Sequence, residues 1–242
     1  MTRQRTLRGR YEAWHRNLDV NEGANEPWHR LVKVHLEPGR DLVGRRVLEI
    51  GCGRGGFTCW LARHPARPVV LVAADIAATA IEKGRAFALQ EKLSWIAWEV
   101  CDIHAICHPD SSFDTVISCE TVEHVHDPRR TLREISRVLK PGGRLFLSVP
   151  NYCGSMGLYR AYLMLRGRKY TEVGQPINRL TLLPVTRRWI KRAGLQIACI
   201  DAVGHYLPLP GRPPIELASL NDPRRVMRWL GLHSVIVAVK PY

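Results

Sequence analysis

The chain has 242 residues and 45% of them are hydrophobic, so it can bury the core of one large α/β domain or two small ones. No run of eighteen apolar residues occurs, which argues against a membrane-spanning helix, and the basic N-terminus lacks the apolar region of a secretory signal. Seven cysteines without a C-x-x-C pair indicate reduced thiols rather than a disulfide framework or a zinc site. We therefore expect a cytoplasmic protein.

The net charge of +14 is distributed unevenly along the chain. Residues 151–242 carry 14 Lys/Arg against four Asp/Glu, whereas residues 1–150 carry 22 against 18. Such a basic excess can attract nucleic acid, an anionic membrane surface or an anionic substrate, or it can be only a solvated face. The charge alone does not decide among these partners.

Strands and helices alternate along the first 150 residues. Residues 1–44 hold aromatic helix fragments and predict an N-terminal helical cover rather than a separate domain. The β-rich apolar runs that follow lie at 45–51, 69–75, 93–100, 113–119 and 143–149, with helical patterns at 56–63, 77–90 and 128–139 between them. This alternation predicts a parallel sheet covered by helices on both faces, and residues 45–150 are its core.

The pattern changes after Pro150. Residues 158–166 predict a short amphipathic helix in a lid insertion, with arginines and tyrosines among leucines and a methionine. Helices are also expected at 183–193 and 222–230, and the last two strands at 195–203 and 234–239. The whole chain is therefore expected to form a single domain of 242 residues.

A glycine-rich loop follows the first strand in V-L-E-I-G-C-G-R-G-G-F (47–57). Glycines let the backbone turn sharply and let a ligand approach the main chain. A dinucleotide site would have G-x-G-x-x-G, whereas the spacing here is Gly51, Gly53, Gly55. Glu49 stands on the strand just before the loop, and a carboxylate there suits a positively charged ligand rather than a diphosphate.

Two further acids end the next two strands. Asp75 follows Gly51 by 24 residues, at a place where a carboxylate can accept from both hydroxyls of a ribose. Asp102 follows the third strand, placed to accept from an adenine amino group with Ile103 against the ring. Each acid alone is more often a solvated strand end. Together with the loop they predict one ligand crevice at the carboxyl edge of the sheet.

The loop, the two acids, F-D-T-V-I-S-C (113–119) and L-K-P-G-G-R-L-F-L-S-V-P-N (139–151) together resemble a class I S-adenosylmethionine-dependent methyltransferase. The resemblance implies a Rossmann-like α/β fold with a seven-stranded sheet, helices on both faces and an antiparallel last strand. It also implies S-adenosylmethionine as cofactor. The positions that it assigns to cofactor binding are Glu49, Gly51, Cys52, Gly53, Gly55, Asp75, Ile76, Asp102, Ile103 and Cys119.

The string Glu120-Thr-Val-Glu123-His124 follows the fourth strand, whose end faces the transferred methyl group in this family. E-x-x-E-H resembles the ubiquinone-biosynthesis O-methyltransferases and the small-RNA 2′-O-methyltransferases. That resemblance implies Mg²⁺ on Glu120, Glu123 and His124, or a catalytic role for His124 as a base with Glu123. The alternative is structural, because E-H-x-x-D-P can tie down a loop while Asp127 caps a helix that starts at Pro128.

Three classes of function fit these observations. O-methylation of a small-molecule hydroxyl is the main expectation, with N- or S-methylation of a small metabolite beside it. Methylation of RNA or another nucleic acid is favoured by the charge and by E-x-x-E-H, but the sequence carries no recognisable RNA-binding module. A binding protein without activity is disfavoured by the intact loop and acids. The basic lid helix also suggests peripheral contact with a membrane, or a packed helix with a solvated basic rim.

Overall fold

One seven-stranded sheet organises the fold in the computed structural model, which describes residues 2–20, 24–167, 175–209, 214–221 and 226–242. Its strands follow the order β3-β2-β1-β4-β5-β9-β6. They are β1 (Arg46–Ile50), β2 (Val70–Asp75), β3 (Ala97–Val100), β4 (Phe113–Cys119), β5 (Leu139–Pro150), β6 (Gln196–Val203) and β9 (His233–Val239). The pairs among β1–β5 are parallel, and β9 runs antiparallel to β5 and β6. The predicted sheet and its reversed last strand are confirmed.

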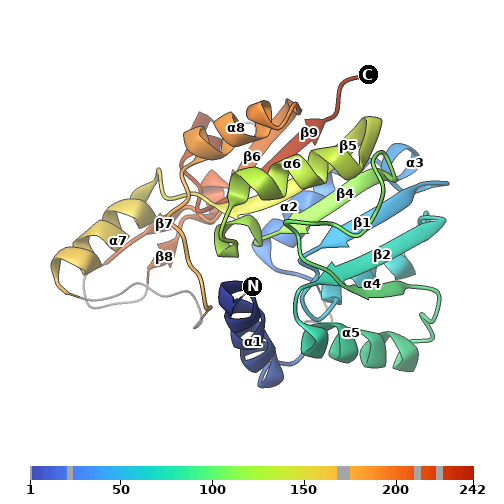
Figure 1. Cartoon of the computed structure of the whole chain (residues 1–242). Helices are drawn as coiled ribbons and strands as arrows, with labels where there is room; N and C mark the ends of the chain where they lie inside the picture. The colour runs from blue at the N-terminus through green and yellow to red at the C-terminus, as the bar shows by residue number, and fades with distance from the viewer. Residues whose placement is uncertain (1, 21–23, 168–174, 210–213, 222–225) are drawn as a thin grey trace.

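Helices cover both faces of this sheet (Figure 1). They are α1 (Thr2–Arg16), α2 (Pro27–His35), α3 (Pro38–Asp41), α4 (Gly56–Arg63), α5 (Ala78–Gln90), α6 (Pro128–Val138), α7 (Ser155–Leu165) and α8 (Leu183–Arg192). Short 3₁₀ turns lie at η1 (Val122–His124), η2 (Ala218–Leu220) and η3 (Val226–Trp229). Within the described ranges, no helix has the length and apolar character needed to cross a membrane.

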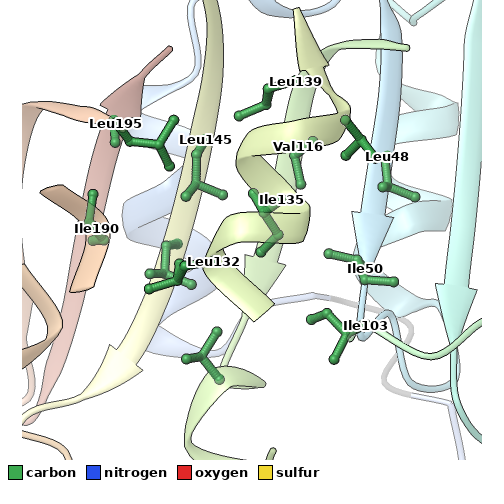
Figure 2. Packing of buried hydrophobic residues seen from close by; sticks show 14 of the residues in the cluster. Leu48, Ile50, Ile103, Val116, Leu132, Ile135, Leu139, Leu145, Ile190 and Leu195 are labelled. Atoms are coloured by element: carbon green, nitrogen blue, oxygen red, sulfur yellow. The ribbon is translucent and has the colours of Figure 1, made fainter. Parts of the chain in front are cut away.

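Sequence periodicity decides which side chains enter each layer. Leu48 and Ile50 are two apart on β1 and face the same side, while Leu132 and Ile135 are three apart on α6 and face the sheet. All four are fully buried and belong to one hydrophobic cluster, in which Figure 2 shows Leu48 and Ile50 on one side of α6 and Leu132 on the other. Residues of α8 complete this layer, whereas α2, α4 and α5 pack on the opposite face. The central parallel strands β1 and β4 are thus buried on both sides, whereas the edge strand β3 is partly exposed.

Helix α6 begins where the sequence predicts. The Asp127 carboxylate accepts hydrogen bonds from the backbone amides of Arg129 and Arg130 at 3.0 and 3.1 Å, and Pro128 occupies the first turn. An acidic cap satisfies amides that have no intrahelical partner and complements the positive end of the helix dipole. The segment before α6, which carries Glu120, Glu123 and His124, is therefore anchored at a defined point.

Several elements differ from the sequence predictions. Strand β3 is shorter than 93–100, because the chain turns until it pairs with β2 at Ala97. Strand β5 starts at Leu139 rather than 143, because Leu139 already pairs with Phe113. The hairpin of β7 (Tyr206–Leu207) with β8 (Ile215–Glu216) lies in a proline-rich region where no strand was predicted. The predicted helix at 222–230 falls partly outside the described residues, and η3 occupies its remainder.

A buried charge cluster fixes α3 against the sheet. The Arg144 guanidinium donates from Nη1 to both carboxylate oxygens of Asp41, at 2.7 and 3.0 Å, and to Glu37 Oε1 at 3.0 Å. Arg144 and Asp41 are both buried, and the Asp41 carbonyl also accepts from Thr115 Oγ1 at 2.9 Å. The cluster therefore joins α3 to β4 and β5 at the edge opposite the carboxyl ends of the strands.

Removing one partner of this cluster should destabilise the fold strongly. Arg144→Ala leaves the Asp41 carboxylate buried without its cation, which costs about 3 kcal/mol of unfolding free energy. The exposed Arg192→Ala is the matched control, with an expected change within about 0.5 kcal/mol. Urea denaturation of the two variants measures the difference. Equal midpoints for Arg144→Ala and Arg192→Ala would contradict the structural role of the cluster.

Candidate active site

A cavity of about 450 Å³ lies at the carboxyl ends of β1, β2 and β4, next to residues of α1 and α2. Parallel strands end at one edge of a sheet, which is where ligands of open α/β folds bind. Most of the residues that the sequence nominates line this cavity: Glu49, Gly51, Cys52, Gly53, Asp75, Ile76, Asp102, Ile103, Cys119, Glu120 and His124. Gly55 and Glu123 do not line it.

Gly51 brings the main chain of the loop close to the segment after β4. Its φ is +76°, and a Cβ there would lie 2.3 Å from the Thr121 side chain, so a side chain fits neither the backbone nor the space. The amides of Gly51 and Cys52 both donate to the Ala74 carbonyl, at 2.8 and 3.0 Å. The loop is thus folded back on β2 and presents its backbone to the cavity.

Gly55 is not among the residues that line the cavity, and its own contacts explain why a glycine stands there. It precedes α4 with a φ of +74°, and a Cβ at this residue would lie 2.2 Å from the Trp98 ring. The glycine therefore permits α4 to start close to β3. It lies on the side of the loop that faces Trp98, not on the side that faces the cavity.

Asp75 links the end of β2 to the glycine loop. Its Oδ2 accepts from the backbone amide of Gly53 at 2.9 Å, and its Oδ1 accepts from the amide of Ala77 at 2.9 Å. The carboxylate is mostly buried and lines the cavity beside Ile76. Two backbone donors fix its orientation, so it is preorganised for a ligand with hydroxyl groups.

Glu49 is buried at the end of β1. Burial raises the pKa of its carboxyl to about 8, although a hydrogen bond from the Thr58 hydroxyl opposes the rise. Burial thus favours the protonated form of this group. A cationic ligand in the cavity would favour the ionised form.

Cys52 and Cys119 contribute thiols rather than thiolates. Both line the cavity, and burial raises the pKa of each thiol well above its usual value, with the nearby carboxylates adding to the rise. The thiolate is the nucleophilic form of cysteine. These residues therefore shape the wall of the cavity and do not provide a nucleophile at neutral pH.

Glu120 occupies the end of β4 in a strained backbone conformation. Its φ is +47°, which is rare for a residue other than glycine, Asn or Asp and is concentrated at functional sites. Ser148 Oγ donates to Glu120 Oε1 at 2.9 Å, and His233 Nδ1 lies 3.2 Å from Glu120 Oε2. Partners on β5 and β9 thus hold this carboxylate at the cavity wall.

His124 and Glu123 face the protein more than the cavity. His124 Nδ1 lies 2.5 Å from the carbonyl oxygen of Ile177, which can only accept, so this nitrogen carries the proton. Its Nε2 lies 3.4 Å from Oε1 of the fully buried Glu123. Arg179 donates to the carbonyls of Val125 and His126. These contacts join η1 to residues 177–179, as the structural alternative for E-H-x-x-D-P requires.

The predicted metal-ligand set does not assemble in this geometry. Glu120 is directed to Ser148 and His233, whereas Glu123 is buried beside His124. Across the described ranges, no group of three or more His, Cys, Asp or Glu residues could hold a metal ion. The three residues therefore do not form a Mg²⁺ site in this geometry, because Ser148 and His233 engage the Glu120 carboxylate while Glu123 lies beside His124.

Helices α1 and α2 supply cavity residues that sequence patterns did not identify. Tyr11 and Trp14 come from α1, and Trp28 and His29 from α2. The Tyr11 hydroxyl donates to the His124 carbonyl at 2.9 Å, and burial raises the pKa of this phenol. The aromatic residues of 1–44 were visible in the sequence, but their long-range contacts with the sheet were not. The helical cover thus closes the cavity.

A carboxylate of α1 anchors this cover to α5. Glu12 Oε1 accepts from the Ala78 amide at 2.8 Å, and Oε2 accepts from the Thr79 amide at 2.9 Å and hydroxyl at 2.6 Å. The residue before α5, Ala77, offers no capping side chain, so Glu12 caps the helix from another element. Lys83 adds a bond to the Arg16 carbonyl at 2.8 Å.

Comparisons with known proteins agree with this architecture. A family model described as a methyltransferase domain matches residues 48–147. A ubiquinone biosynthesis O-methyltransferase of Xanthomonas oryzae is 35% identical over 213 residues, covering 83% of each chain. The enzyme of that name from Coxiella burnetii is 30% identical over 203 residues, covering 77% of this chain and 80% of its own.

Solved structures support the fold. The putative methyltransferase of Haloferax volcanii, in complex with the Trm112 methyltransferase activator, has a TM-score of 0.68, 22% identity and 98% coverage of both chains. A putative sarcosine dimethylglycine methyltransferase from Galdieria sulphuraria has a TM-score of 0.65, 18% identity and the same coverage. At this identity the likeness concerns the fold alone.

The Glu12 cap gives the helical cover a defined pH dependence. Burial by itself would raise the pKa of Glu12, but the bonds from Thr79 and Ala78 outweigh it and lower the pKa from 4.5 to about 2. The ionised Glu12 carboxylate stabilises the docking of α1 on α5 fully above pH 4.5, and this stabilisation is lost as the pH falls towards 2. Docking of α1 should therefore be equal at pH 5 and pH 8.

Glu12→Gln should loosen α1 at neutral pH. The side-chain NH₂ group of Gln would replace one acceptor oxygen and face the backbone N–H donors of α5, with which it cannot form a hydrogen bond. We expect about fivefold faster hydrogen exchange across residues 7–16, since one or more hydrogen bonds to a charged group are lost. Glu82→Gln, on the exposed side of α5, is the control and should leave exchange unchanged. Equal protection in both variants would show that Glu12 does not hold the cover.

Proposed function

We propose that this chain, which belongs to the family of S-adenosylmethionine-dependent methyltransferases, methylates a hydroxyl oxygen of a small molecule. Curated relatives at 30–35% identity are named as O-methyltransferases of ubiquinone biosynthesis. The observation that carries the choice of oxygen is the Glu120 carboxylate, held at the cavity wall by Ser148 and His233. A phenolic quinone precursor is the first acceptor to test.

The cofactor residues follow from the order of the strand ends. We assign the ribose to Asp75, whose orientation two backbone amides fix. We assign the adenine to Asp102 and Ile103 after β3, which line the cavity together with Ile76. Gly51 supports this assignment only by its place in the cavity lining, next to the end of β1.

The methionine part of the cofactor is assigned to the other side of the cavity. Gly51, Cys52 and Gly53 present the loop backbone there, next to Glu49 and Cys119. A cationic cofactor near Glu49 would compensate the burial that raises the pKa of this carboxyl to about 8. Glu49 is thus the carboxylate next to the loop that would balance the positive charge of the ligand.

S-adenosylmethionine supplies an activated methyl carbon, so the protein mainly has to place the acceptor oxygen in line with it. We infer that Glu120 accepts a hydrogen bond from the acceptor hydroxyl and takes its proton as the oxygen–carbon bond forms. His124 and Glu123 serve as positioning residues that hold η1 against residues 177–179. No step is assigned to Mg²⁺, because the described residues contain no group of three or more side chains that could hold a metal ion.

Methylation of nucleic acid and of a nitrogen or sulfur are the alternatives to this proposal. An amine or thiol is activated more easily than a hydroxyl, so a carboxylate held at the acceptor end favours oxygen. Aromatic side chains of α1 and α2, including Tyr11 and Trp28, line the cavity, and its volume of about 450 Å³ suits a small acceptor rather than a polynucleotide. We propose that the whole chain, lid insertion included, serves this one catalytic domain.

The exposed surface of α7 favours contact with a membrane as part of the proposed function. Leu158, Met164 and Leu165 are 76%, 66% and 89% exposed, so they are not packed in a core as one reading of the sequence suggested. The exposed Arg166 follows the last turn of the same helix, whereas Arg160 is half-buried against the Tyr152 ring. Apolar and cationic side chains together suit an anionic lipid surface, where an apolar acceptor would be found.

The function can be tested by product formation from matched acceptors. Purified chain and S-adenosylmethionine should methylate a catechol or another phenol, and not the corresponding aniline or thiophenol, as measured by mass spectrometry. Asp75→Ala should lower the rate at least about tenfold at limiting cofactor, because the ribose partner is removed. Adding EDTA should leave the rate unchanged.

Two outcomes of this assay would contradict specific parts of the proposal. Methylation of the aniline or thiophenol with no reaction of any phenol would reject the oxygen acceptor. Loss of activity in EDTA with recovery in Mg²⁺ would instead restore the metal site that the sequence suggested. Asp110→Ala, an exposed acid far from the cavity lining, is the control for Asp75→Ala.

The membrane contact is tested separately with vesicles. Chain should cosediment with vesicles that contain anionic phosphatidylglycerol and not with neutral phosphatidylcholine vesicles. Leu165→Glu should reduce the bound fraction several-fold without lowering activity towards a water-soluble acceptor, because it opposes both the apolar and the cationic character of α7. Unchanged cosedimentation of Leu165→Glu would reject α7 as the contact.

A further inference from the structure

A histidine that none of the sequence motifs includes lies between the two halves of the proposed site. His104 follows β3, lines the cavity and is buried. Its Nδ1 lies 2.8 Å from Asp102 Oδ1, and its backbone amide donates to the same oxygen at 2.9 Å. Its Nε2 lies 3.2 Å from the backbone amide of Asp127. One imidazole therefore touches the acid at the end of β3 and the cap of α6.

The tautomer of this imidazole follows from its partners. The backbone nitrogen of Asp127 can only donate, so His104 Nε2 must accept and cannot carry a proton. The proton of a neutral ring then lies on Nδ1, which donates to the Asp102 carboxylate. His104 is thus a directional link with a donor on the cavity side and an acceptor on the helix side.

The far end of this link is rigid. Asp127 caps α6 through its side chain, and Arg130 in the first turn of α6 donates from Nε to the His104 carbonyl at 2.8 Å. Both the ring and the backbone of His104 are therefore tied to α6, which is packed on the sheet. The Asp102 carboxylate is held by a side chain whose own position is fixed, as a precise ligand contact requires.

We propose that His104 is a positioning residue that orients Asp102 towards the adenine amino group through its Nδ1–H. The inference rests on the proposed function, because it assigns the adenine to Asp102. His104 acts through Asp102 and so sets recognition of the base rather than the chemistry of transfer. It also fixes the end of β3 relative to the segment before α6, which carries the acceptor-side residues.

Two conservative substitutions separate this role from simple packing. Asn places an amide nitrogen near the position of Nδ1, so His104→Asn keeps the donor to Asp102 and loses the acceptor for Asp127. Gln places its amide near the position of Nε2, so His104→Gln keeps the acceptor and loses the donor. If His104 only filled space, the two substitutions would change recognition of the adenine base equally.

The test is calorimetric titration with S-adenosylhomocysteine and with S-inosylhomocysteine, in which a carbonyl replaces the adenine amino group. His104→Asn should bind the adenosyl ligand within about twofold of wild type, and His104→Gln about tenfold more weakly, because a hydrogen bond to a charged group is lost. Binding of the inosyl ligand should not differ between the variants. The preference for the adenosyl ligand should therefore fall only in His104→Gln.

The control is His108→Gln, since His108 also pairs with a carboxylate, Glu99 at 2.8 Å, but lies outside the cavity lining. It should bind both ligands as wild type does, and melting temperatures show that each variant is folded. Equal weakening by Asn and Gln, or an unchanged adenosyl preference in His104→Gln, would overturn the inference. If the wild-type protein binds neither ligand, the proposed function itself fails. If Asp102→Ala weakens binding of the adenosyl ligand but His104→Gln does not, only the role of His104 is rejected.

Discussion

The parallel pairing of β1 with β2 and β4 is the constraint on which the site depends. Because these strands run in one direction, the glycine loop, Asp75 and Glu120 all emerge at the same edge. The bond from the Gly53 amide to Asp75 then couples the loop to the neighbouring strand. No single residue makes this cavity, which arises from the register of three strand ends.

The two sides of the cavity are stabilised in different ways. On the cofactor side, carboxylates are held by backbone amides or by His104, so their orientation is set before a ligand binds. On the acceptor side, the strained backbone of Glu120 is retained because β5 and β9 provide Ser148 and His233 as partners. The reversed strand β9 thus contributes a functional contact as well as completing the sheet.

Local patterns in the sequence predicted the elements that depend on neighbouring residues. Strand periodicity, the glycine spacing and the Asp127-Pro128 helix start all reappear in the structure, because each is determined within a few residues. Contacts over long sequence distances were not predictable, and Glu12 capping α5 or His233 beside Glu120 are examples. The metal set suggested by E-x-x-E-H required three side chains to meet at one point, whereas Glu120 contacts Ser148 and His233, which come from distant parts of the sequence.

The central claim is that the strand ends hold S-adenosylmethionine under the cover formed by α1. A crystal structure of the chain with S-adenosylhomocysteine tests it most directly. The account predicts ribose hydroxyls within hydrogen-bond distance of Asp75, adenine against Ile103 with its amino group at Asp102, and sulfur directed towards Glu120. A ligand that lies outside this cavity, or whose ribose does not contact Asp75, would contradict the account.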